Sequence, residues 1–232
     1  MHINITLPNN KEVVVKPFLY KHIRDLLFLN SSLESKLLYL EDFILTKNLN
    51  VVEKFITLLK LRAICIKPTV SLNLDKTGKD VDIDYITESF EESIDIRTTT
   101  ECDGIEITLD YPTKFCINTD NILSVIREVK IQDQFIVVDS LSKNEYEQVM
   151  SKLPAQVLNA VSEFVEDKKD AFTFRLLEGR KDTSELNFLG PAPFEFINTI
   201  YACIDVNSYR EYIYVLSKRI KDVNFLINST MA

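Results

Sequence analysis

The spacing of apolar residues changes near residue 68, and this change restricts the fold more than any other feature of the chain. In residues 51–66, apolar side chains recur every three or four positions, as on a helix with a buried face. Pro68 ends that pattern, and apolar residues then alternate with polar ones in residues 70–74 and 81–85. Such alternation is typical of paired strands. A chain that contains both patterns is predicted to be an α+β protein, here mostly helical with a central antiparallel β insert.

Two further hairpins are predicted, one on each side of this central region. Residues 3–7 and 13–15 surround a polar turn near the N-terminus, and Pro17 then opens a leucine-rich helix. Residues 172–176 and 186–189 alternate in the same way around a charged turn. The N-terminal hairpin therefore leads the chain into a helix, and the late hairpin precedes the last helices.

The central insert is expected to contain more strands than its first hairpin. Period-two apolar residues predict strands around residues 94–96 and over residues 105–109, the latter ending at Tyr111-Pro112. Helices are expected to resume from Thr119, which can cap a segment that carries apolar residues as far as Val129.

Capping-box spacings mark several helix starts, because a polar cap followed three residues later by Glu satisfies free N–H groups at a helix end. They occur at Ser31 with Glu34, at Asn50 with Glu53 and at Ser142 with Glu145. Further helices are predicted after Leu153-Pro154, over residues 194–204, and over residues 207–226.

Three regions follow from these patterns. Residues 1–67 form an N-terminal hairpin and helical region, residues 68–117 the β insert, and residues 118–232 a helical region with the late hairpin. The Gly-Pro-Ala-Pro sequence at 190–193 is the best hinge candidate in the chain. All three regions can also form one compact unit, since the length and the 46% hydrophobic content allow a single large core.

The sequence contains no catalytic, cofactor or metal signature. Only four glycines occur, and neither GxGxxG nor GxxxxGK is present. Two histidines, His2 and His22, and four widely spaced cysteines offer neither a zinc motif nor an evident nucleophile–base pair. No segment has the length and apolar character of a membrane span or a secretory signal. We therefore expect no enzyme, no cofactor, no metal and no membrane contact.

Charge is distributed unevenly along the chain. The net charge is −8, and residues 75–110 alone hold twelve acidic and three basic residues. Many of these acids fall on alternate strand positions, which is typical of the solvated face of a one-sided sheet. A contact for a basic partner, or a weak cation site, is the alternative interpretation. A general nucleic-acid role is disfavoured, because phosphate contacts require a basic surface.

The C-terminal part combines aromatic and basic residues, the types that are enriched at protein interfaces. Core packing explains some of these residues, and nucleic-acid binding is a weaker alternative. The predicted protein-interface residues are Phe188, Leu189, Phe194, Tyr209, Arg210, Tyr212, Tyr214 and Arg219.

In its order of motifs, the chain resembles the baseplate hub subunits and hub assembly chaperones of contractile-tailed, T-even-type bacteriophages. The resemblance depends on Leu7-Pro8 with Lys16 to Leu19, the helix Phe55 to Ala63, Leu109-Asp110-Tyr111-Pro112, and Asp139-Ser140-Leu141 before Leu153-Pro154. It covers residues 3 to about 165, and the C-terminal third matches only loosely. Many members of that family carry a cysteine-bearing ribbon in the β insert, whereas residues 68–85 of this chain lack paired cysteines, so a zinc site is not carried over from the resemblance.

The resemblance implies a non-enzymatic tail protein that assembles the central hub of the baseplate or remains within it. The implied partners are other hub proteins, the tape-measure protein and further copies of the chain. The implied location is the host cytoplasm during assembly, or the baseplate of the virion. Two alternatives from the residues stay open: a hydrolase that uses paired carboxylates, and a nucleic-acid-binding adaptor.

Overall fold

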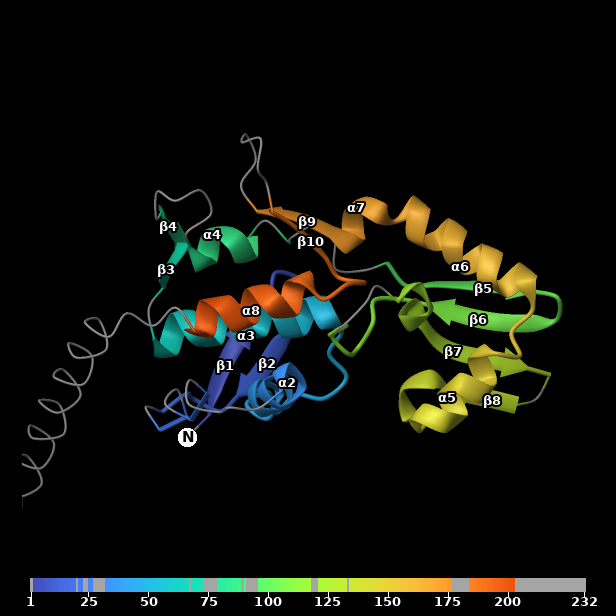
Figure 1. Cartoon of the computed structure of the whole chain (residues 1–232), viewed down its shortest axis with the longest axis horizontal. Helices are drawn as coiled ribbons and strands as arrows, with labels where there is room; N and C mark the ends of the chain where they lie inside the picture. The colour runs from blue at the N-terminus through green and yellow to red at the C-terminus, as the bar shows by residue number, and fades with distance from the viewer. Residues whose placement is uncertain are drawn as a thin grey trace, which may run out of the picture.

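The structure is a computed structural model, and two lobes make up the part of the chain that it describes (Figure 1). The helical lobe holds α2, α3, α4 and α8 with three short hairpins, and the sheet lobe holds a four-stranded sheet with α5 and α6. The predicted α+β class is confirmed. The described residues are 2–19, 21–22, 25–26, 32–66, 68–72, 79–88, 90, 96–117, 121–132, 134–176 and 184–202.

The N-terminal hairpin forms as predicted. Strands β1 (Ile3–Thr6) and β2 (Glu12–Val15) pair antiparallel, and Asn10 adopts a positive φ of 62° in the turn between them. Helix α2 (Leu33–Glu41) begins at Ser32, whose side chain accepts a hydrogen bond from the Ser35 amide. The chain then returns to β2 through a bridge between Val15 and Ile44.

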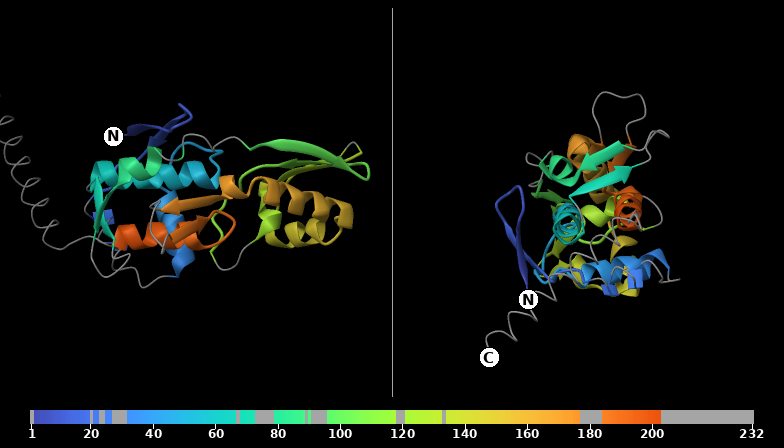
Figure 2. Two further views of the ribbon diagram at one scale, coloured as in Figure 1. Left: turned by 90° about the horizontal axis from the view of Figure 1, so that it is seen from above. Right: turned by 90° about the vertical axis from the view of Figure 1, so that its left-hand side faces the viewer.

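Helix α3 (Val51–Cys65) is the central element of the helical lobe. Its predicted capping box is present, with Asn50 and Glu53 each accepting a hydrogen bond from the other's backbone amide. Most of its side chains are buried around its whole circumference, which is typical of a helix enclosed by other elements. Figures 1 and 2 show it beside α8 (Ala192–Ala202), with which it is in contact.

The second hairpin is shorter than its apolar pattern predicted. Strands β3 (Thr69–Leu72) and β4 (Lys79–Asp82) pair as expected, but helix α4 (Ile83–Glu88) follows at once. The prediction that the returning strand reaches residue 85 is therefore wrong. Ile83 and Ile86 are both buried and three residues apart, so they pack as one side of a helix against α3.

The sheet lobe contains strands that the sequence interpretation assigned differently. Strands β5 (Thr98–Cys102), β6 (Ile105–Leu109), β7 (Ile126–Ile131) and β8 (Gln134–Val137) form an antiparallel meander in that order. The 105–109 strand is confirmed. The strand predicted around residues 94–96 lies instead at β5, and residue 94 is outside the described residues.

The predicted helix from Thr119 to Val129 is wrong where the structure describes it. Asn121 caps only a single 3₁₀ turn, η1 (Ile122–Val125), and Thr119 lies outside the described residues. The chain then extends because β6 offers a pairing partner, with Leu109 opposite Ile126 and Ile107 opposite Val129. β-branched residues suit such a paired, half-buried surface.

Helices cover one face of this sheet. Helix α5 (Lys143–Met150) has the predicted capping box between Ser142 and Glu145, and α6 (Ala155–Asp167) buries Val157, Val161 and Phe164. Figure 2 shows α6 along one face of the sheet, with the opposite face open. The short helix α7 (Lys169–Phe172) then leads into the hairpin of β9 (Thr173–Leu176) and β10 (Ser184–Asn187), which returns to the helical lobe.

One cluster of buried side chains extends through both lobes, from Ile5 in β1 to Tyr201 in α8. The division at residues 67 and 117 and the hinge at 190–193 stay predictions, and in the structure residues 190–193 form the turn that starts α8. The long helix predicted over residues 207–226 lies outside the described residues. Within the described part, no helix combines the length and hydropathy that a membrane span requires.

Candidate protein-interaction site

The structure places three of the predicted interface residues in the core. Phe188, Leu189 and Phe194 are 1%, 3% and 0% exposed, and the Phe188 ring packs edge-on against Phe55 at 5.4 Å between ring centroids. Core packing thus accounts for their apolar character, and a partner would reach them only after rearrangement. The other five predicted residues, Tyr209, Arg210, Tyr212, Tyr214 and Arg219, lie outside the described residues.

His22, for which the sequence offered no evident nucleophile to act on, has a local packing role. Its Nδ1 accepts a hydrogen bond from the Leu19 amide at 3.0 Å, and its ring lies 5.0 Å from the Phe43 ring. Partial burial, with the neighbouring Lys21 charge, lowers the pKa of His22 below 6.5. The imidazole therefore accepts a backbone hydrogen bond in its neutral form.

The structure offers no clustered metal ligands in the part that it describes, where no three His, Cys, Asp or Glu side chains converge. The weak cation site that the acidic region offered would involve the alternating acids Asp80, Asp82 and Asp84. Asp80 and Asp82 belong to β4 and Asp84 to α4, so these three residues are divided between a strand and a helix. Burial raises the pKa of the Cys65 thiol, which favours its inert protonated form.

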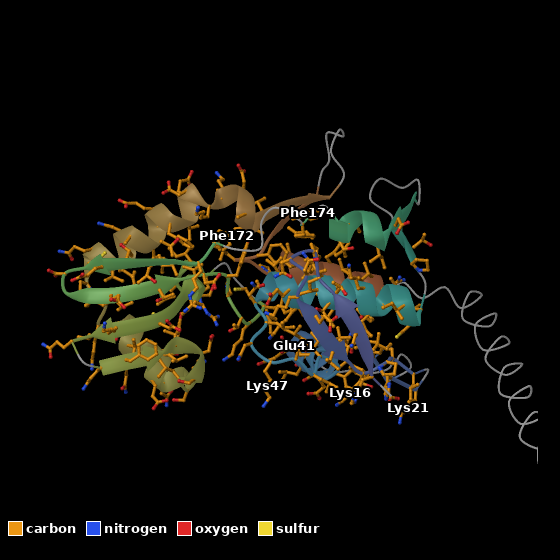
Figure 3. All side chains as sticks on the ribbon, turned by 180° about the vertical axis from the view of Figure 1, so that it is seen from behind. Lys16, Lys21, Glu41, Lys47, Phe172 and Phe174 are labelled. Atoms are coloured by element: carbon orange, nitrogen blue, oxygen red, sulfur yellow. The ribbon has the colours of Figure 1, made fainter. Side chains whose placement is uncertain are left out.

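A cleft of about 1230 Å³ lies between the helical and sheet lobes. Its walls come from the β1–β2 turn, the loop after α2, the start of α3, the segment after β6, and β7 with the end of β8. Figure 3 shows Glu41 and Lys47 on the helical-lobe side of this boundary. The cleft is lined mainly by polar and charged side chains, so it suits a polar or peptide-like ligand better than an apolar small molecule.

Ion pairs neutralise most of the charge in the cleft. Five basic and five acidic residues line it, and four of each form pairs with one another. These pairs are Lys11–Glu53 and Lys54–Glu41, both at 2.8 Å, Arg97–Glu128 at 3.1 Å, and Arg127–Asp139. The cleft is therefore close to neutral despite its many charged groups.

Glu53 connects the N-terminal hairpin to the central helix. Glu53 is 5% exposed, and its carboxylate accepts hydrogen bonds from the Asn50 amide, the Lys11 ammonium group and the Asn9 side-chain amide. The carboxylate also lies at the N-terminus of α3, where the helix dipole favours a negative charge. The sequence indicated the capping role of Glu53 but not its link to Lys11, 42 residues away.

Two of the motifs behind the family resemblance meet at the base of the cleft. Asp139 accepts a hydrogen bond from Thr113 at 2.6 Å and pairs with Arg127, and the Pro112 carbonyl accepts one from the Val51 amide at 2.7 Å. The hydroxyl of the buried Tyr111 donates to the Ala171 carbonyl at 2.9 Å. We call Tyr111-Pro112 the lobe junction, because it joins the sheet lobe to α3 and α7.

The outer face of the sheet carries two rows of side chains that end in apolar residues on β8. One row runs through Glu101, Glu106 and Lys130 to Phe135, and the other through Thr99, Thr108 and Glu128 to Val137. Phe135 is 59% exposed and Val137 is 40% exposed. Val137 also lines the cleft, so the outer side of β8 and the cleft form one continuous surface.

Comparison with known proteins identifies the class to which this structure belongs. A family model described as T4 bacteriophage base plate protein matches residues 1–176, about three-quarters of the chain. The chain therefore belongs to this family. No curated protein and no solved structure matches the chain.

Membership of the family has direct consequences for function. The protein is a structural protein of the bacteriophage tail, its place is the baseplate of the virion, and it interacts with other baseplate proteins. The predicted resemblance is confirmed at this level. The matched region ends at residue 176, so it includes β8, the cleft and the lobe junction but not α8.

Proposed function

We propose that this protein builds the central hub of the baseplate, or is a subunit of it, through contacts with other hub proteins and with the tape-measure protein. The observation that carries the proposal is the continuous surface of the cleft and β8, within the matched region. This surface combines exposed apolar side chains with paired charges, as protein interfaces do. The protein acts in the host cytoplasm during assembly and does so without catalysing a reaction.

The arrangement of carboxylates supports assembly over the hydrolase alternative. A carboxylate-pair hydrolase requires two acids that face each other across a substrate, one of them protonated. In the cleft, Glu41, Glu53, Glu128 and Asp139 each contact a basic side chain, and Asp110 accepts a hydrogen bond from the Tyr111 amide at 2.7 Å. These contacts occupy the carboxylates with groups of the protein itself.

The same pairs argue against the nucleic-acid alternative. A phosphate backbone binds to basic side chains that are free to replace its counterions. Lys11, Lys54, Arg97 and Arg127 each already bind a carboxylate, and the whole chain carries a charge of −8. Retention of the purified protein on heparin at moderate salt would contradict this argument.

Co-expression tests the proposal directly. We expect the full chain, expressed with the hub and tape-measure proteins of the same phage, to co-purify with at least one hub protein and to co-elute in gel filtration. An unrelated tail protein from outside the baseplate is the negative control. If the chain elutes alone in every combination and does not self-associate, the proposal is wrong.

Mass spectrometry of purified virions then separates the two forms of the proposal. A subunit is present in mature particles in a fixed ratio to other hub proteins, whereas an assembly chaperone is present in infected cells and missing from particles.

A further inference from the structure

We infer that the outer edge of β8 receives an extended segment of another baseplate protein, which adds to the sheet as a fifth strand. The inference rests on the proposed function and names the contact through which it operates. We call the outer side of Gln134–Val137 the β8 edge. Among the described strands, β7 alone pairs with β8, so no strand pairs with the other side of β8. At the end of this edge the Val137 carbonyl accepts a hydrogen bond from the Ser140 hydroxyl at 2.7 Å, which a fifth strand would have to share or displace.

The two edges of the same sheet provide an internal comparison. The β5 edge has the sequence Thr-Thr-Thr-Glu-Cys and includes the charged Glu101, and a charge on an edge strand discourages pairing. The β8 edge has the sequence Gln-Phe-Ile-Val and contains neither a charged residue nor Pro. A sheet that protects one edge and leaves the other apolar is suited to pairing at the second edge.

The side chains of β8 indicate what the added strand looks like. Phe135 and Val137 both lie on the outer face, two residues apart, and both are exposed. A strand paired with β8 would place alternate side chains next to these two, where apolar and aromatic pairs are the favourable neighbours. The partner segment therefore carries apolar residues at alternate positions, and backbone hydrogen bonds to β8 supply the remaining contacts.

The length of the edge favours an extended segment over a second copy of this chain. Four residues span only about 13 Å, and self-pairing of two such edges would bury much less than the roughly 1,200 Å² of a stable interface. A larger contact requires the cleft, which begins at Val137. The β8 strand of a second copy is part of a folded sheet and cannot enter the cleft, whereas an extended segment can pair with β8 and continue into it.

A variant with two substitutions, which we call the paired variant, tests the inference and is designed to leave the fold intact. In Phe135→Glu/Val137→Lys, the new Glu lies opposite Lys130 and the new Lys opposite Glu128, so the cross-strand pairs are attractive. The β8 edge becomes charged and resists pairing. The control is Ile64→Glu on α3, because Ile64 is 57% exposed and thus closely matches Phe135. Equal melting temperatures of both variants and the wild type establish that the fold is intact.

The measurements use the full chain and the hub protein that co-purifies with it. We expect the paired variant to bind at least about tenfold more weakly than the wild type, while Ile64→Glu binds normally. Independently of any variant, hydrogen–deuterium exchange of the wild type is expected to slow at residues 134–137 in the complex.

Three outcomes would overturn the inference, and they differ in what they say of the proposed function. If a complex forms but the paired variant binds normally and residues 134–137 exchange as fast as in the free chain, the inference fails and the hub function stands. If residues 134–137 are already protected from exchange in the isolated protein, the β8 edge pairs with another part of this chain or with a second copy. Protection that increases with protein concentration indicates a second copy. If no complex forms with any hub protein, the proposed function fails and the inference with it.

Discussion

Removal of the Glu53 carboxylate is expected to loosen the N-terminal hairpin from the central helix. The Glu53→Ala variant loses the side chain that accepts hydrogen bonds from the Asn50 amide and from Lys11. The Glu53→Gln variant retains an N3 residue that can complete a capping box but loses the negative charge. Comparison of the two variants therefore separates the capping contribution from the ion pair.

The structure allows the two contributions to be estimated. A capping interaction contributes about 1 kcal/mol to the free energy of unfolding. A hydrogen bond between charged groups contributes about 1.5–3 kcal/mol when buried, but the Lys11 side chain is 37% exposed, so solvent screening reduces the value here to about 1 kcal/mol. We expect Glu53→Ala to cost about 2 kcal/mol and Glu53→Gln about 1 kcal/mol, and for a chain of this size 2 kcal/mol lowers Tm by about 4–8 °C.

Urea unfolding followed by far-ultraviolet circular dichroism measures these losses, since the chain contains no tryptophan. A double-mutant cycle with Lys11→Met isolates the ion pair, for which we expect a coupling of about 1 kcal/mol. Lys169→Met is the control, because its ion pair with Glu166 has both side chains at least 70% exposed and a separation of 3.9 Å. If the losses of unfolding free energy in Lys11→Met and Glu53→Gln add fully in the double variant, the assigned link between hairpin and helix is refuted.

Three other perturbations each test the role of a single residue. Gly104→Val is expected to lower the free energy of unfolding in urea by about 1–2 kcal/mol, because Gly104 has a φ of +76° that a β-branched residue adopts only with strain. No atom lies within 4 Å of an added Cβ, so the loss comes from backbone conformation and not from a steric clash. The same loss is not expected for Thr99→Val on β5. Tyr111→Phe is expected to cost about 1–2 kcal/mol by leaving the Ala171 carbonyl without its donor, and an unchanged free energy of unfolding would contradict the assigned lobe junction. Because burial lowers the pKa of His22 in the folded state, its contribution to stability is complete above pH 6.5 and is lost as the pH falls through the folded-state pKa. The wild type should therefore lose Tm relative to His22→Gln on acidification, and an NMR titration that places the His22 pKa above 6.5 would rule this out.

Local signals predicted the helix starts well. Two of the three predicted capping boxes form, Asn50 with Glu53 and Ser142 with Glu145, because a capping box depends only on residues three positions apart. The N-terminal hairpin and helix α6 were predicted for the same reason, since each depends on a pattern within one short segment. The box predicted at Ser31 with Glu34 is wrong, because α2 is capped by Ser32, which accepts a hydrogen bond from the Ser35 amide.

Elements that depend on distant partners were predicted poorly. Ile126 and Val129 fit a helical spacing equally well, and only pairing with β6 makes them a strand. Asp103-Gly104 was an available signal that the interpretation did not use: φ values of 57° and 76° are those of the two-residue hairpin turn that Asp-Gly favours, and this turn marks β5 as the partner of β6.

The candidate site was out of reach of pattern analysis because its residues come from separate segments. Lys11 and Glu53 are 42 residues apart, and Thr113 and Asp139 are 26 apart. The sequence did single out Tyr111-Pro112 and Asp139 as family motifs, but it could not show that they meet. It also placed interface residues at Phe188 and Leu189, since aromatic and aliphatic composition does not distinguish a core from a contact surface.

The lobe junction determines how a ligand meets the cleft. The buried Tyr111 hydroxyl, the Pro112 carbonyl and the continuous core hold the two walls at a set separation before any partner arrives. If the segment inferred above binds here, we expect this protein to reorganise little, so that most of the entropic cost of association falls on the segment as it becomes ordered. Mutations that loosen Tyr111 are therefore expected to weaken binding by allowing a wider range of cleft geometries, even though Tyr111 itself is buried.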